Sequence, residues 1–95
     1  MPEKETEKIL VAGVKKLGGR AYKWTSPGNA GVPDRIVILP GKSPVFVELK
    51  TESGRLSSLQ HVQCKRLKEL GQDVRVLYGE KAVRDFLEEC QKNGV

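Results

Sequence analysis

The chain has 95 residues, of which 17 are Lys or Arg and 12 are Asp or Glu, so its formal net charge is +5. This length fits one domain with a modest core, and we expect residues 1–95 to fold as a single unit that would gain stability by pairing. The basic balance favours a polyanionic partner. The charged first residues, and the lack of an apolar run of about 20 residues, lead us to expect no signal peptide, no membrane contact and a cytoplasmic location.

Hydrophobic periodicity and chain breakers predict five segments in the first half of the chain. A helix is expected over Glu3–Leu17, where apolar residues recur at helical spacing and two glycines follow. Ala21–Trp24 is predicted to be a strand, and Ser26–Pro33, rich in proline and glycine, is predicted to be a loop. Arg35–Leu39 and Val45–Lys50 are rich in β-branched residues and flank a short connection, so we expect them to form a hairpin.

The second half is predicted to contain two helices and one strand. A helix is expected over Ser57–Leu70, with Ser57 as its N-cap and a glycine directly after its end. Val74–Tyr78 is predicted to be a strand parallel to the second strand of the hairpin, because a helix separates the two. A last helix is expected over about Ala82–Gln91, with its end near Gly94. The predicted fold class is α/β, in the order helix, three strands, helix, strand, helix, with a mixed central sheet.

Three charged residues lie on or beside the predicted hairpin. Side chains alternate faces along a strand, so Glu48 and Lys50 point the same way while Leu49 points into the opposite layer. Asp34 directly precedes the neighbouring strand and can add a second carboxylate. Alone, each has an ordinary alternative, as a turn aspartate or as a solvated pair on a half-buried strand. Together they could hold a hard divalent cation with a lysine beside it, which is typical of metal-assisted phosphodiester hydrolysis.

The predicted helices bring two further polar residues toward these strands. Glu7 lies one turn before the apolar stripe of the first helix, although it could simply favour the positive end of that helix. Gln60 lies one turn before the apolar positions of the second helix and should therefore face the sheet. His61 follows it and should point away from that face.

A set of short motifs spans nearly the whole chain. Its members are Gly31-Val32-Pro33-Asp34, Val47-Glu48-Leu49-Lys50, Gly54-Arg55-Leu56-Ser57 with Gln60, and also Gly18-Gly19, Lys23, Ser26-Pro27-Gly28 and Gly71. As a set they closely resemble the VRR-NUC nucleases of the PD-(D/E)XK superfamily, in the small stand-alone form found in phages and bacteria. A bare Pro-Asp followed by Glu-x-Lys would be much less specific. The resemblance implies a restriction-endonuclease-like core over residues 1–95.

The resemblance also implies roles for individual residues. Asp34 and Glu48 match the paired metal-binding carboxylates, and Lys50 matches the residue that orients the attacking water and stabilises developing negative charge. Gln60 matches the helix glutamine that supports that lysine. Glu7 matches the acid of the first helix that completes the metal shell.

Two details of this metal shell stay open from the sequence. Glu3 and Glu5 lie close enough to Glu7 that either could be the ligand from the first helix. The Leu49 carbonyl could also bind the metal, because hard cations readily accept main-chain oxygens. The cofactor implied is Mg²⁺ or Mn²⁺.

Several residues could contact a nucleic acid. Lys23 and Ser26 are candidates for touching the substrate phosphate, although a lysine on an edge strand could equally guard against aggregation. Candidates for contacts to the nucleic-acid backbone are Arg20, Arg35, Arg55, Lys65, Arg66 and Lys68. Tyr22 and Trp24 could stack on bases, but aromatic residues in so aromatic-poor a chain more often belong to a core or a dimer contact.

These observations together predict a Mg²⁺- or Mn²⁺-dependent endonuclease that hydrolyses phosphodiester bonds in DNA. The resemblance implies a homodimer that cuts branched DNA such as Holliday junctions. Two alternatives remain from the sequence: a DNA-binding module of the same fold without catalysis, and a nuclease that acts on ordinary duplex DNA. Intact Asp34, Glu48 and Lys50 argue against the first, and the lack of an extra element for reading bases in the major groove argues against sequence-specific duplex cleavage.

Overall fold

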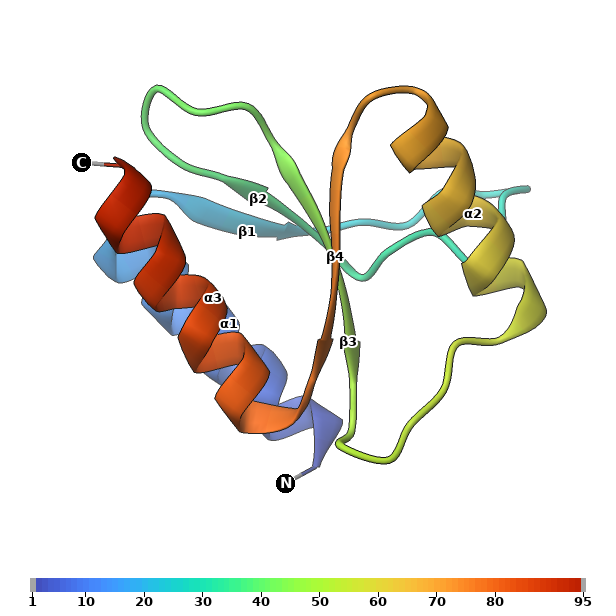
Figure 1. Cartoon of the computed structure of the whole chain (residues 1–95), viewed down its shortest axis with the longest axis horizontal. Coiled ribbons are helices and arrows are strands. Elements are labelled where there is room, and N and C mark those ends of the chain that lie inside the picture. Colours follow the sequence, from blue (N-terminus) through green and yellow to red (C-terminus); the bar gives the residue numbers. More distant parts are fainter. Residues whose placement is uncertain (1, 95) are drawn as a thin grey trace.

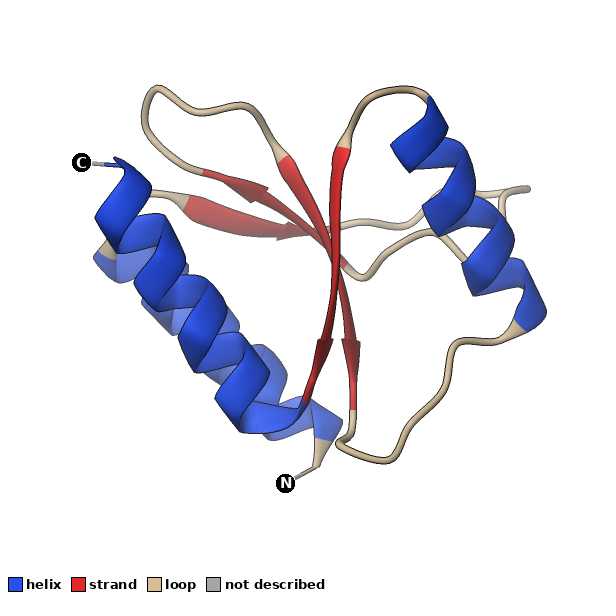
Figure 2. Ribbon diagram, in the orientation of Figure 1, coloured by secondary structure: helices blue, strands red, loops and turns tan. Residues whose placement is uncertain are grey.

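The computed structural model describes residues 2–94, which form three helices and four strands. In chain order these are α1 (Glu3–Lys16), β1 (Arg20–Lys23), β2 (Arg35–Ile38), β3 (Val45–Lys50), α2 (Ser58–Glu69), β4 (Asp73–Tyr78) and α3 (Gly79–Gly94). Figure 2 shows the helices and strands in one view. The order is the one predicted from the sequence, so the α/β fold class is confirmed.

The four strands form one mixed sheet in the order β1-β2-β3-β4. The pairs β1–β2 and β2–β3 are antiparallel, which confirms the predicted hairpin. The pair β3–β4 is parallel, because the chain crosses through α2 before it returns to the sheet. The C-terminal ends of β3 and β4 therefore lie side by side, where Lys50 is aligned with Tyr78.

Helices cover the two faces of the sheet unequally (Figure 1). On one face, α1 and α3 pack together over the sheet, and α2 lies on the other face beside β4. The core lies between the sheet and the α1–α3 pair and is built from Leu10, Val14, Ala21, Val37, Val47, Leu49, Leu77, Val83 and Phe86. Val47 and Leu49 belong to this core, so the alternation along β3 turns Glu48 and Lys50 toward the α2 side.

The last helix begins earlier than its sequence pattern predicts. We expected it over about Ala82–Gln91 with an end near Gly94, and α3 does end at Gly94, but it begins at Gly79, directly after β4. Glu52, from the connection after β3, packs closely against Gly79, so that a Cβ at position 79 would displace the Glu52 side chain. A carboxylate near a helix N-terminus favours the start of the helix, and a contact across 27 positions of the chain leaves no local sequence signal.

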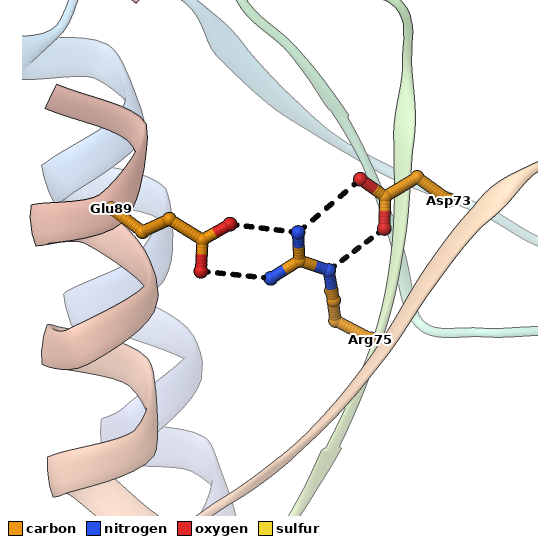
Figure 3. A network of polar contacts seen from close by, with 3 residues as sticks. All are labelled: Asp73, Arg75 and Glu89. Carbon is orange, nitrogen blue, oxygen red and sulfur yellow. Dashed lines mark hydrogen bonds and ion pairs between the residues drawn. The ribbon is translucent and has the colours of Figure 1, made fainter. Parts of the chain in front are cut away.

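A polar network joins α3 to β4 (Figure 3). Arg75 on β4 bonds Asp73 on its own strand at 2.7 Å and Glu89 on α3 at 2.8 Å. The two carboxylates raise the pKa of the Arg75 guanidinium, which also lies 5.6 Å from the centre of the Phe86 ring. The bidentate geometry of the Arg75 fork ties α3 to the edge strand of the sheet.

Candidate active site

Asp34 and Glu48 lie opposite each other on the α2 side of the sheet. The pairing of β2 with β3 aligns Arg35 with Val47, so the preceding Asp34 falls opposite Glu48. The Leu49 N–H donates a hydrogen bond to Asp34 Oδ2 at 2.9 Å and holds that carboxylate against β3. Two carboxylates separated by fourteen positions of the chain are thus fixed side by side on neighbouring strands.

The two oxygens of the Glu48 carboxylate have different surroundings. Its Oε2 accepts a hydrogen bond from Gln60 Nε2 at 2.9 Å, and Lys50 Nζ lies 3.7 Å from the same atom. Its Oε1 is the one buried side-chain oxygen in residues 2–94 that has no hydrogen-bond partner. Glu48 itself is only 1% exposed. One oxygen is therefore held by the protein, and the other is left for a ligand that the protein does not supply.

The surroundings of Glu48 oppose its ionisation. Burial is the main cause, and the negative charge of Asp34 is the next, and together they raise the pKa of Glu48 from 4.5 to about 7. Lys50 acts in the opposite direction, while Glu3 and a hydrogen bond to Asp34 add to the increase. An ionised Glu48 would place its charge beside Asp34, with an Oε1 that no hydrogen bond holds. A cation between them would remove the conflict.

Gln60 is placed on the sheet-facing side of α2, as predicted, but its direct partner is not the expected one. The resemblance implied that it supports Lys50, whereas its amide bonds Glu48 and meets Lys50 only through the shared Glu48 Oε2. The same side chain completes a capping box with Ser57, the predicted N-cap of α2. The amide thus belongs both to the helix start and to the carboxylate site.

The Leu49 carbonyl faces the same side of β3 as Asp34. Within a strand, the N–H and C=O of one residue point to the same side, and the Leu49 N–H bonds Asp34. This carbonyl therefore points toward the carboxylate pair and not toward β4. Its orientation fits the main-chain ligand expected from the sequence, while metal binding by Leu49 itself stays a prediction.

These residues fit a divalent cation that retains much of its own hydration. Within the described residues 2–94, no three His, Cys, Asp or Glu side chains gather into a complete metal site. Asp34, Glu48 and the Leu49 carbonyl can supply three oxygen ligands, and the unpartnered Glu48 Oε1 lies among them. Mg²⁺ prefers oxygen ligands and usually keeps several waters, so a partial protein shell suits it.

The acids of the first helix are divided between two environments. Glu7 Oε2 lies 2.9 Å from both Arg35 Nε and Arg35 Nη2, so its carboxylate is already paired. Glu3, one turn earlier, is the acid of α1 whose charge acts on Glu48. The role of Glu7 as a metal ligand stays a prediction, and in this arrangement it would have to leave Arg35. Glu3, the alternative ligand from this helix, stays a prediction as well.

The predicted substrate contacts do not gather at one place. Arg35 points toward α1, on the face opposite to Glu48, where it bonds Glu7 and the Ala21 carbonyl. Lys23 is aligned with Arg35 and lies exposed on that same face. Ser26 closes a turn in the loop before β2 by accepting a hydrogen bond from the Asn29 side chain. Arg55 is exposed in the connection between β3 and α2. Substrate contact by these four candidates stays a prediction.

Trp24 lies beside the carboxylate pair. Its N–H donates to the Asp34 carbonyl at 2.9 Å, which extends the β1–β2 pairing by one position. Its half-buried ring packs against Phe46, with the ring centres 5.4 Å apart. The sequence left open whether Trp24 stacks on bases or packs within the protein. The observed contact with Phe46 supports packing within the protein.

Sequence reasoning missed a close contact between the Asp34 loop and α2. Gly31 adopts a φ of +94°, and a Cβ built on it would lie 2.6 Å from the carbonyl of Leu59 and 2.9 Å from the Gln60 nitrogen. The loop that precedes Asp34 is therefore seated directly on the backbone of α2. The motif Gly31-Val32-Pro33-Asp34 marks the glycine, but which element it contacts depends on the tertiary fold.

Comparisons with known proteins agree with this arrangement. No family model matches the chain. The chain is 47% identical over 75 residues to "Putative nuclease p44" of Acyrthosiphon pisum secondary endosymbiont phage 1. The matched segment covers 79% of this chain and 81% of that protein. A solved structure described as "VRR_NUC domain" superposes with a TM-score of 0.83 at 28% identity and covers 98% of this chain and 97% of the other. None of the helices in residues 2–94 could span a membrane. The chain belongs to the VRR-NUC nucleases.

Proposed function

We propose that this nuclease is a divalent-metal-dependent endonuclease that hydrolyses phosphodiester bonds in DNA. The observation that carries the proposal is the Asp34–Glu48 pair, in which a buried carboxylate oxygen has no partner and a lysine lies 3.7 Å from the other oxygen. A Mg²⁺ or Mn²⁺ ion bound there would supply positive charge at the scissile phosphate and would make a water molecule more acidic.

The side chains around the pair would divide the remaining work. Asp34 and Glu48, with the Leu49 carbonyl, would hold the cation. Lys50 is fixed on the same strand face as Glu48 and would place a positive charge beside the phosphate, where negative charge develops during attack. Gln60 would keep Glu48 oriented through its hydrogen bond of 2.9 Å.

The DNA substrate that we propose is branched, such as a four-way junction, and the active form that we propose is a homodimer. Two sites related by a two-fold axis can meet opposite strands of a pseudo-symmetric junction, which a single small domain cannot do. The support is the resemblance to small stand-alone family members, together with the exposed Tyr22 and Ile38 on the sheet face that carries Glu48. We place this activity in the cytoplasm of a bacterial or phage-infected cell, in keeping with the phage relative.

The test is a cleavage assay with linear, forked and four-way DNA in Mg²⁺, Mn²⁺ or EDTA. We expect cleavage with either metal and none in EDTA, and paired symmetric nicks in the four-way DNA. Asp34→Asn and Lys50→Ala should each lower the cleavage rate by at least about 100-fold, because each removes charge that acts at the reacting phosphate. Both variants should retain the wild-type fold and most of the DNA affinity.

The matched control for Lys50→Ala is Lys81→Ala. Lys81 pairs with Asp85 on the exposed surface of α3, so its removal changes the net charge equally without touching the site. It should cleave at the wild-type rate. Wild-type rates in Asp34→Asn and Lys50→Ala would refute the site. Binding of DNA without cleavage of any substrate would favour the non-catalytic module.

A further inference from the structure

One side-chain amide joins the start of α2 to the buried carboxylate. Gln60 Oε1 accepts a hydrogen bond from the Ser57 main-chain N–H at 2.8 Å, and Gln60 Nε2 donates to Glu48 Oε2 at 2.9 Å. The Ser57 hydroxyl in turn accepts from the Gln60 main-chain N–H at 3.2 Å. Because the Ser57 N–H can only donate, the amide oxygen must face it, and the amide donor is thereby turned toward Glu48.

We propose that the Ser57 main-chain N–H is a positioning group for the active site, which acts by fixing the orientation of the Gln60 amide. The fixed amide holds Glu48 Oε2 and leaves Oε1 turned toward the cation site. A flipped amide would set its oxygen against Oε2 of the ionised Glu48 carboxylate, so that two acceptors would face each other without a hydrogen. The role toward the cation rests on the function proposed above, whereas the orientation of the amide does not.

The consequence is that one side chain, Gln60, both caps the start of α2 and orients the proposed metal ligand Glu48. A capping box normally serves the helix alone, by satisfying main-chain N–H groups at its start. Here the Gln60 side chain has a second bond, so a disturbance at Ser57 is expected to reach Glu48 through this amide. Groups that orient a ligating carboxylate typically account for about ten- to a hundredfold in metal affinity or activity.

Proline at position 57 removes the positioning group while suiting the local backbone. Ser57 has a φ of −72°, which is close to the angle that a proline ring imposes. Ser58→Pro is the matched control, since it adds the same ring at the first helical position, where proline is favoured and the N–H has no partner within the helix. Ser57→Ala removes the hydroxyl and keeps the N–H, so it separates helix capping from the orientation of the amide.

The experiment measures the Gln60 side-chain amide resonances by NMR and Mn²⁺ affinity by titration calorimetry, on the full chain. In Ser57→Pro, the resonances should move to solvent-exposed values and the Mn²⁺ affinity should fall by about ten- to a hundredfold. Ser58→Pro should resemble the wild type in both measurements. Ser57→Ala should lower the melting temperature by about 4–8 °C through loss of the cap, and should keep the amide resonances and the Mn²⁺ affinity.

A second variant tests whether Ser57 acts through Gln60. Gln60→Met should weaken Mn²⁺ binding as much as Ser57→Pro does, and the double variant should be no weaker than either single one. Wild-type Mn²⁺ affinity in Gln60→Met or Ser57→Pro would overturn the proposal, and so would losses that add in the double variant. A wild-type protein that neither binds Mn²⁺ nor cleaves DNA would instead refute the proposed function, while unchanged amide resonances in Ser57→Pro would still refute the orientation by Ser57.

Discussion

At the scale of single residues, Glu48 carries the charge conflict on which the proposed metal site rests. Its burial, which leaves it 1% exposed, and the neighbouring charge of Asp34 both favour its protonated form. The protein offers it Gln60 and Lys50 at one oxygen only. The ionised form of Glu48 therefore lowers the stability of the fold at the position where the cation would bind. Such a cost is expected at a site that binds a charged ligand.

The loss of stability that comes with ionising Glu48 can be measured as a dependence of the free energy of unfolding on pH in the absence of metal. The pKa of Glu48 is raised from 4.5 to about 7 in the folded state, so the folded protein binds more protons than the unfolded chain between these values. The contribution of protonated Glu48 is fully present below pH 4.5 and is lost as pH rises through about 7. From this group alone, we expect the free energy of unfolding in EDTA to fall by about 3 kcal/mol across that range.

Urea denaturation of Glu48→Gln at pH 5 and pH 8 checks this expectation, because the amide is neutral at both. The variant should lack the decrease that the wild type shows, and it should be the more stable protein at pH 8 without metal. Glu69→Gln removes the same charge from an exposed position on α2 and should keep the wild-type decrease. Parallel curves for wild type and Glu48→Gln would mean that Glu48 is already ionised at neutral pH.

At the scale of secondary-structure elements, the site depends on the contact between the Asp34 loop and α2. Gly31 and Gly28 share this loop and have similar φ angles of +94° and +83°. Backbone atoms of Leu59 would lie 2.6 Å from a Cβ on Gly31, whereas nothing lies within 4 Å of one on Gly28. A side chain at position 31 must therefore push the loop away from the helix that carries Gln60.

Alanine at these two glycines separates backbone strain from the loss of this contact. Gly28→Ala should cost about 1 kcal/mol of stability, because its only penalty is the left-handed backbone. Gly31→Ala should cost about 3 kcal/mol, because overpacking adds to the same penalty. Gly31→Ala should also lower the cleavage rate by about tenfold or more, since small displacements of catalytic groups are costly. Urea denaturation and the cleavage assay measure both effects, and equal losses in the two variants would contradict this account.

The sequence predicts the elements of this fold well because their signals are local. Periodicity and breakers place the hairpin, the order of the elements and the Ser57 cap, and the alternation along β3 puts Glu48 and Lys50 on one face. What it misses depends on contacts between elements. The early start of α3 follows Glu52 from a distant connection, and the partner of Gln60 depends on how far α2 lies from β3. Neither of these two contacts can be predicted from the local sequence pattern.

At the scale of the whole molecule, the sheet has one face that its own helices do not fully cover. On the α2 side, α2 lies beside β4 (Figure 1), and no helix in residues 2–94 lies over β1 and β2 there. Tyr22 is 58% exposed and Ile38 is 36% exposed on this face. Ile36 is aligned with Tyr22, Phe46 is aligned with Ile36, and both are half-buried. We call these four residues the open sheet face. Apolar surface of this kind favours a partner.

If the proposed homodimer forms through the open sheet face, a charge placed there should separate it. By light scattering after size exclusion, the wild type should have twice the chain mass of 10.5 kDa, whereas Tyr22→Glu and Ile38→Glu should have the mass of one chain. Leu70→Glu is the control, because Leu70 is 68% exposed at the C-cap of α2, the helix that packs against β4 at the opposite edge of the sheet from β1, and this variant should remain paired. A monomeric wild type would refute the dimer, and loss of pairing in Leu70→Glu alone would move the interface to α2.

The monomeric variants keep Asp34 and Glu48, so they should still nick DNA. Paired nicks in one four-way junction should be lost, since two sites are needed to cut opposite strands together.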